Sequence, residues 1–172
     1  MNNPFVLFNL PQTFDIDKKL LNEQYLSLQK SLHPDKFAHC SAQEQRLAIQ
    51  KSAQINDALE TLKNPISRAE CLIALNTESS ETQEKSNQDI AFLMQQMQWR
   101  ELLEEIEVSK NFTQYTDLCD EVDAVEKDIL KQLRDSLQNE DWVNATLYVD
   151  RLKFMRKLQV EIERLEDLFM DF

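Results

Sequence analysis

Glycine is absent from this chain of 172 residues, and no proline follows Pro65. Glycine and proline interrupt helices more strongly than other residues, so residues 66–172 should form long helices. Dinucleotide-binding fingerprints and P-loops require glycine where the backbone approaches phosphate, and tight hairpin turns prefer it where φ is positive. The sequence therefore predicts an all-α fold and argues against a nucleotide-binding α/β enzyme.

Proline and charge divide the chain at the same place. All four prolines lie within the first 65 residues, and residues 1–75 carry eight basic and eight acidic side chains. Residues 76–172 carry eleven basic and 23 acidic ones, so the second part holds the whole net charge of −12. Residues 76–86 are polar or charged throughout, which is typical of a linker. We therefore predict one domain over residues 1–75, a linker over 76–86 and a second domain over 87–172.

The composition also argues against several kinds of partner and site. An acidic second half disfavours nucleic acid, because binding to the phosphate backbone needs clustered lysine and arginine. No apolar run reaches about 18 residues and no basic flank precedes the apolar N-terminal residues, so we predict neither a membrane span nor a signal peptide. Cys40, Cys71 and Cys119 are widely spaced and form no C-x-x-C pair. We expect a cytoplasmic protein with reduced thiols, no metal site and no cofactor.

Helix caps and prolines mark the helices of the first domain. Asparagine followed by proline suits a cap and a first helical position, and a serine three residues before a glutamate suits a capping box. Proline also disfavours the helical conformation of the residue before it. The predicted helices run from Asn3 and Pro4 to about Leu10, from about Asp17 to before Pro34, from Ser41, boxed with Glu44, past Leu62, and from Asn64 and Pro65 to Leu75. The apolar face of the second of these helices is made of Leu21, Tyr25, Leu28 and Leu32.

Three long amphipathic helices are predicted in the second domain. They run from Ser86 to about Val108, from Phe112 to Gln138, and from Trp142 onward after a turn at Asn139 to Asp141. Ser86 and Asp89 have the spacing of a capping box, and the last helix keeps its apolar residues three or four positions apart. Three such helices with short connections form an antiparallel bundle.

The second helix of the first domain ends in His33-Pro34-Asp35, followed by Lys36 and Phe37. By itself this tripeptide is a weak signal, because a proline that ends a helix and an aspartate that makes a local turn also explain it. Its setting is more specific, since it lies between an apolar-faced helix and a separately capped helix. A loop held between two antiparallel helices presents its polar side chains rigidly outward.

This arrangement resembles a J-domain, the module that recruits DnaK-type chaperones and stimulates their ATPase. The resemblance implies that the chaperone binds at Tyr25, Lys30, His33, Pro34, Asp35 and Lys36. J-domains usually carry a strongly basic second helix, whereas here Glu23, Leu26 and Ser27 share that helix with three lysines. We therefore expect a weaker charge attraction and a more restricted partner.

The first helix of the second domain carries apolar residues on two sides. The side expected to face the core contains Phe92, Trp99, Leu102, Leu103 and Ile106. The other side, about 170° away by helical geometry, contains Leu93, Met94 and Met97 among Gln98, Glu101, Glu104 and Glu105. These three residues either are buried by a bundle that wraps more of the helix or form an exposed patch rimmed by carboxylates, which is typical of a partner site.

These residues, with Arg100 and behind a glycine-free J-domain-like region, resemble the HscB family of iron-sulfur co-chaperones over essentially the whole chain. In that family the J-domain engages a dedicated DnaK-type chaperone, HscA, and the bundle delivers the scaffold protein IscU for transfer of its cluster. The resemblance implies scaffold contacts at Leu93, Met94, Met97, Arg100, Glu101, Glu105 and Phe154. Gln98 stands where the family typically has an acid. Phe154 lies off the apolar stripe of the last helix, as either an exposed contact or an aromatic at the core edge.

The function implied is that of an adaptor and not of an enzyme. The cysteine-containing N-terminal extension of the human-type proteins does not precede Met1, which favours the bacterial form. An enzymatic alternative rests on His33, His39 and Cys40 near Asp35, which suggest a metal or Cys-His site but share one exposed loop without buried orienting groups. A J-protein adaptor for a different client is the other alternative, and the absence of general client-binding regions argues against it.

Overall fold

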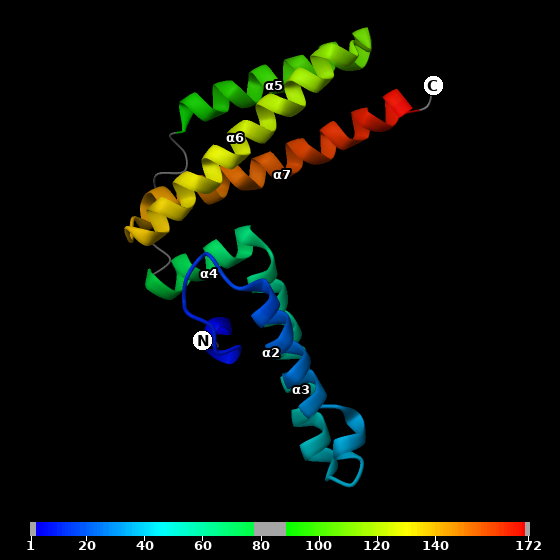
Figure 1. The fold of residues 1–172 in the computed structure, drawn as a ribbon, viewed down its shortest axis with the longest axis vertical. Coiled ribbons are helices and arrows are strands. Elements are labelled where there is room, and N and C mark those ends of the chain that lie inside the picture. The colour runs from blue at the N-terminus through cyan, green and yellow to red at the C-terminus, as the bar shows by residue number, and fades with distance from the viewer. Residues whose placement is uncertain (1–2, 78–88, 171–172) are drawn as a thin grey trace. The chain divides into compact units, whose positions relative to one another are not determined.

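The computed structural model describes residues 3–77 and 89–170, which form helices with no strand among them (Figure 1). The predicted all-α fold is confirmed. The chain divides into two compact units, Met1–Asn76 and Thr77–Phe172, and most of the segment predicted as a linker lies outside the described residues. The helices of the first unit are α1 (Pro4–Leu7), α2 (Lys18–Ser31), the 3-10 helix η1 (Pro34–Phe37), α3 (Ala42–Lys63) and α4 (Pro65–Asn76). Those of the second are α5 (Ile90–Ser109), α6 (Phe112–Gln138) and α7 (Trp142–Met170).

The helices of the first unit begin at the caps that the sequence predicts. The side chain of Asn3 accepts a hydrogen bond from the N–H of Phe5, and that of Asp17 accepts one from Leu20. Ser41 and Glu44 form the complete capping box, because each side chain accepts from the other residue's backbone N–H, at 3.2 and 3.1 Å. Each cap satisfies an N–H that has no partner inside its own helix.

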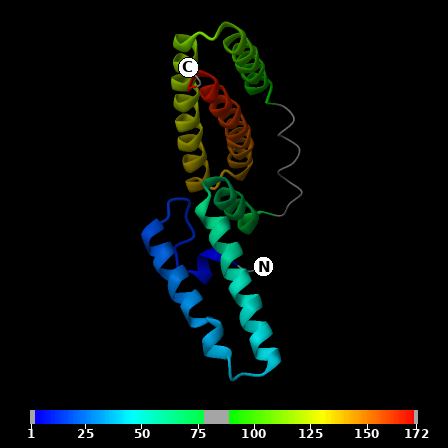
Figure 2. The ribbon, with the colours of Figure 1, turned by 90° about the vertical axis from the view of Figure 1, so that its right-hand side faces the viewer.

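Helices α2 and α3 lie side by side and antiparallel (Figure 2). The hydroxyl of Tyr25 donates to Oδ1 of Asn56 at 2.8 Å, and the hydroxyl of Ser52 donates to Oε1 of Gln29 at 2.7 Å. From Tyr25 to Gln29 the chain advances four residues on α2, while the partner on α3 moves back four residues, from Asn56 to Ser52. The two helices therefore run in opposite directions. Of the apolar face predicted for α2, only Leu21 is buried, while Tyr25, Leu28 and Leu32 are half-buried, because this part of α2 packs mainly against α3.

The core of the first unit lies where α1 and α4 pack against α3. Phe5, Phe8, Ile55, Leu62 and Ala69 are at most 1% exposed. Arg68 is buried among them. Its Nη1 donates to the carbonyl oxygen of Leu62 at 2.7 Å, and its guanidinium lies 4.8 Å from the centre of the Phe14 ring.

In the second unit, α6 and α7 form a long pair and α5 packs against both (Figure 1). The backbones of α6 and α7 approach each other over much of their length, whereas α5 approaches either of them closely at few positions. The largest side chains that are almost completely buried are Trp99, Ile106, Leu118, Val122, Leu133, Leu152, Met155 and Leu158. Leu102, predicted to face the core, is only half-buried.

Helix α5 begins later than predicted. Asp89 is its N-cap and Ile90 its first residue, while Ser86, the other member of the predicted capping box, lies outside the described residues. The side chain of Asp89 makes no cap hydrogen bond, because its carboxylate is bonded to Arg151 of α7. The capping-box interpretation of Asp89 is therefore wrong: the residue joins two helices.

Three turns adopt the left-handed conformation without glycine. Asn9, Lys110 and Glu140 have φ values of 52°, 53° and 57°. Lys110 ends α5, and its N–H donates to the carbonyl oxygen of Ile106 at 2.8 Å. A residue with a Cβ costs about 1 kcal/mol more than glycine in this conformation. In residues 3–77 and 89–170, no helix has the length and apolar character needed to cross a membrane.

Candidate functional site

The His-Pro-Asp motif lies on η1, and we call residues 33–37 the tip. His33 is the N-cap of η1, and its Nδ1 accepts a hydrogen bond from the N–H of Asp35 at 3.3 Å. Pro34 occupies the first helical position, where a missing N–H has no cost. The N–H of Lys36 donates to the carbonyl oxygen of His33 at 2.9 Å. The imidazole and the proline therefore form the turn, and the interpretation in which the side chain of Asp35 makes it is wrong.

The carboxylate of Asp35 faces solvent. Its side chain is 92% exposed, and its Oδ2 lies 3.5 Å from Nδ1 of His33. An exposed carboxylate on a backbone of fixed shape is an acceptor for an arginine, a lysine or a backbone N–H of a partner.

The tip is attached to α3 as well as to α2. The side-chain amide of Gln45, in the first turn of α3, donates to the carbonyl oxygens of Phe37 and Cys40 at 3.0 and 3.4 Å. Phe37 is half-buried, so the tip is anchored by packing and by hydrogen bonds. This bracing supports the predicted rigid presentation of the motif.

The structure brings four of the six predicted chaperone-binding residues together. His33, Pro34, Asp35 and Lys36 form the exposed part of the tip, and Lys30 lies exposed in the last turn of α2. Tyr25 differs from them, because it is half-buried and its hydroxyl is bonded to Asn56. Its hydrogen bond to Asn56 shows that Tyr25 joins α2 to α3.

The enzymatic alternative required a metal site or a Cys-His site near the tip. Among the residues that the structure describes, no group of three or more histidine, cysteine, aspartate or glutamate side chains is placed to hold a metal ion. Each of the three cysteines is a free, half-buried thiol, and desolvation and the nearby carboxylate of Glu44 raise the pKa of Cys40, the cysteine of the enzymatic alternative. A raised pKa leaves less thiolate at neutral pH, which disfavours nucleophilic catalysis.

In the second unit, a cluster of three apolar side chains of α5 is exposed to solvent. Leu93, Met94 and Met97, which we call the α5 patch, are 55%, 59% and 58% exposed. The core side of the same helix is buried at Phe92, Trp99, Leu103 and Ile106. The interpretation of the patch as core is therefore wrong. Arg100, Glu101, Glu104, Glu105 and Gln98 are also exposed, so the patch has a charged rim.

Phe154 of α7 lies at the edge of the core. Its side chain is half-buried, and its ring centre lies 5.7 Å from that of Phe92, edge to face, and 6.3 Å from that of Trp99, nearly parallel. Of the two interpretations that the sequence left open, the core-edge aromatic is the one observed. Any scaffold contact by Phe154 is made with the part of the ring that remains exposed.

Phe154→Ala should therefore destabilise the bundle. Fully buried phenylalanines lose about 3–5 kcal/mol on such truncation, and a half-buried one with two ring partners should lose about 2 kcal/mol. Urea unfolding followed by circular dichroism measures the loss. Val160→Ala, which truncates a side chain of the same helix that is 66% exposed, is the control and should change stability little. Equal stability of the two variants would contradict the ring packing.

A salt bridge joins the start of α5 to α7. Nε and Nη2 of Arg151 donate to the two carboxylate oxygens of Asp89 at 2.7 and 2.8 Å. The same guanidinium lies 5.1 Å from the ring centre of Phe92 and 5.6 Å from that of Tyr148. The hydrogen bonds with Asp89 raise the pKa of Arg151 above its ordinary value. Sequence reasoning missed this bridge, because its partners are 62 residues apart and no local spacing connects them.

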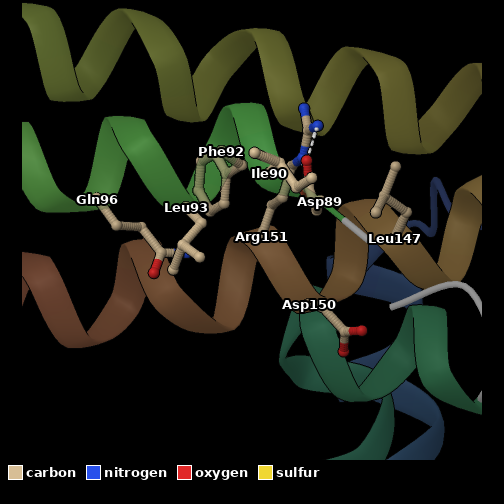
Figure 3. Close-up of a pocket in the computed structure, with 8 residues that line it drawn as sticks. All are labelled: Asp89, Ile90, Phe92, Leu93, Gln96, Leu147, Asp150 and Arg151. Carbon is tan, nitrogen blue, oxygen red and sulfur yellow. Dashed lines mark hydrogen bonds and ion pairs between the residues drawn. The ribbon is translucent and has the colours of Figure 1, made fainter. Parts of the chain in front are cut away.

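A small pocket opens beside this bridge, between α5 and α7 (Figure 3). Its volume is about 180 Å³. Leu93 and Gln96 reach from α5 toward α7 in Figure 3. The lining residues are Asp89, Ile90, Phe92, Leu93, Gln96, Leu147, Asp150 and Arg151. Leu93 belongs to both the pocket and the α5 patch, so the two are continuous.

A helical hairpin that carries His-Pro-Asp on a braced tip, followed by a three-helix bundle, defines the class of J-type co-chaperones. Residues 88–163 match the family model described as the HSCB C-terminal oligomerisation domain. The chain is 56% identical to the co-chaperone protein HscB homolog of Mannheimia succiniciproducens, with 100% of both chains covered. It is 49% identical to the homolog of Haemophilus influenzae, with 97% of both covered. The chain therefore belongs to the HscB family.

Two solved structures share its fold. The chaperone HscB from Vibrio cholerae is 39% identical, with a TM-score of 0.90 over 97% of this chain and 99% of that one. The human co-chaperone protein HscB is 24% identical, with a TM-score of 0.84 over 96% of this chain and 83% of the human one. The human structure, at this identity, supports the fold alone.

Proposed function

We propose that this protein recruits an IscU-like iron-sulfur scaffold protein to an HscA-like DnaK-type chaperone and stimulates the ATPase of that chaperone. It thereby assists the transfer of iron-sulfur clusters to acceptor proteins, in the cytoplasm. The observation that carries the proposal is the presentation of Asp35, whose carboxylate is 92% exposed on a tip braced by Gln45. The membership of the chain in the HscB family supports the same function.

The chaperone binds at the tip and the adjoining end of α2. Asp35 supplies an acceptor, while Lys30 and Lys36 supply positive charge beside it. Hydrolysis takes place in the chaperone's own active site, so this protein needs no catalytic residue. Its contribution is to bind the conformation of the chaperone that hydrolyses ATP faster, since a ligand shifts an equilibrium by its differential affinity for two states.

The scaffold protein binds at the α5 patch and its rim. Leu93, Met94 and Met97 offer apolar area, and methionine adapts its shape to a partner because its side chain is flexible. Arg100, Glu101 and Glu105 give the contact its orientation through charge. Phe154 supports the patch from beneath through Phe92 and Trp99.

Because both sites lie on one chain, the encounter between the bound chaperone and the bound scaffold becomes effectively intramolecular. When the tip and the α5 patch are both occupied, the scaffold is held near the chaperone at an effective concentration set by the connection between the units. Stimulation should therefore be greater when the scaffold is present.

Two measurements test the proposed function. Affinity purification of the tagged protein from its native cytoplasm should recover one DnaK-type chaperone and one iron-sulfur scaffold protein, identified by mass spectrometry. In a steady-state ATPase assay with those two purified partners, the protein should accelerate hydrolysis. Recovery of the chaperone with a different client would favour the alternative of a J-protein adaptor for another substrate. Unchanged hydrolysis would reject the proposal.

A further inference from the structure

We propose that the pocket between α5 and α7 is a specificity pocket of the docking surface, where one aliphatic side chain of the docked scaffold protein inserts. The inference rests on the proposed function and extends the scaffold site from the α5 patch into the space between α5 and α7. It adds Ile90 and Leu147, neither of which sequence reasoning singled out, to the contact surface.

Half of the residues that line the pocket are apolar, and three of them are accessible to a partner. Ile90 and Leu93 of α5 are 67% and 55% exposed, and Leu147 of α7, another lining residue, is half-buried. Ligand pockets for small molecules have volumes of about 300–1,000 Å³. This pocket, at about 180 Å³, is smaller and suits a single side chain. Since Leu93 is shared, a partner seated on the α5 patch lies directly beside the opening.

The Asp89–Arg151 bridge forms part of the pocket lining and restrains the start of α5 against α7. Arg151 is fixed by two charge-assisted hydrogen bonds and by the rings of Phe92 and Tyr148. Such bonds are stronger than neutral ones and restrict geometry. A site that is already formed loses less conformational entropy when a partner binds.

Charge identifies the occupant as a different protein and not a second copy of this chain. Glu101, Glu104 and Glu105 rim the patch, Asp150 lines the pocket, and the chain has a net charge of −12. A symmetric dimer through this face would bring the same carboxylates toward one another, which is unfavourable. A scaffold segment with lysine or arginine beside its aliphatic side chain complements the face.

Titration calorimetry with the purified IscU-type scaffold protein of the same organism tests the inference. The variant Ile90→Ala/Leu147→Ala should bind about tenfold more weakly, as expected when central contacts of an interface are truncated. Val160→Ala/Met170→Ala is the control, because it truncates two exposed side chains of α7 outside the pocket, and its affinity should be unchanged. Leu147→Trp should also weaken binding, since it fills the pocket. If Leu147→Trp acted only by adding apolar area to the surface, it would instead strengthen binding.

The outcomes separate the pocket from the proposed function. If Leu93→Ala/Met97→Ala weakens binding while both pocket variants bind like the wild type, the pocket inference is overturned and the proposed function stands. If the wild type does not bind the scaffold, both are overturned. Sedimentation velocity that shows a dimer broken by Leu147→Trp would make a second copy the occupant and overturn the inference. Should Ile90→Ala/Leu147→Ala prove unfolded by circular dichroism, Leu147→Trp alone decides.

Discussion

Asp35→Ala is expected to abolish stimulation of the partner chaperone's ATPase while leaving the affinity for the scaffold protein unchanged. The carboxylate is 92% exposed and the turn around it is made by His33 and Pro34, so its removal leaves the tip in place. A surface substitution of this kind usually changes stability by no more than about 0.5 kcal/mol. The loss of stimulation would therefore report a lost contact with the chaperone and not a lost fold. A steady-state ATPase assay and a scaffold titration on the same preparation measure the two effects.

The matched control is Asp57→Ala, which removes an exposed carboxylate from α3, outside the tip. Both variants lose one negative charge from the same unit, so a general electrostatic effect would appear in both. Stimulation should persist with Asp57→Ala. Retained stimulation with Asp35→Ala would contradict the assignment of the tip as the chaperone site.

Leu93→Ala/Met97→Ala should weaken scaffold binding at least tenfold, equivalent to about 1.4 kcal/mol, with little change in melting temperature. Both side chains are more than half exposed, so truncating them removes little area that folding has buried. Core leucine and methionine residues would instead lose about 2–5 kcal/mol each on truncation to alanine. Calorimetry of unfolding and of scaffold binding on the same variant distinguishes a docking surface from a core.

Val160→Ala/Met170→Ala serves again as the control, because it removes exposed apolar side chains from another part of the bundle. Its scaffold affinity should match that of the wild type. A large loss of stability in Leu93→Ala/Met97→Ala, with binding per folded molecule unchanged, would show that the α5 patch contributes to folding and not to docking.

Most helices could be predicted from the sequence because their ends are marked by local signals. Asn3, Asp17 and Ser41 each cap the helix predicted to follow them, and Asn111 caps α6 in the same way. Such caps involve residues two or three positions apart, so a single sequence contains all the information needed. The separation of the α5 patch from the core stripe could also be predicted, because it follows from helix geometry alone, whereas the exposure of the patch was left open.

Several features that sequence reasoning missed depend on contacts between distant helices. Asp89 was interpreted as part of a local capping box, but its carboxylate is bonded to a guanidinium 62 residues away. Phe154 could not be assigned, because its burial depends on where Phe92 and Trp99 of another helix place their rings. Whether a polar side chain near a helix start caps that helix or bonds to a neighbouring helix depends on how the bundle packs.

The uneven packing of the bundle has a consequence for hydrogen exchange. The backbone of α5 approaches α6 and α7 closely at few positions, whereas α6 and α7 are paired over much of their length. Segments with fewer close contacts open at a lower free energy than that of global unfolding. Amide protons of α5 are therefore expected to exchange with solvent through openings that leave the α6–α7 pair folded, and a protein bound to the outward face of α5 should slow this exchange. The helix that carries the proposed docking surface should thus be the part of the bundle whose local stability a partner changes most.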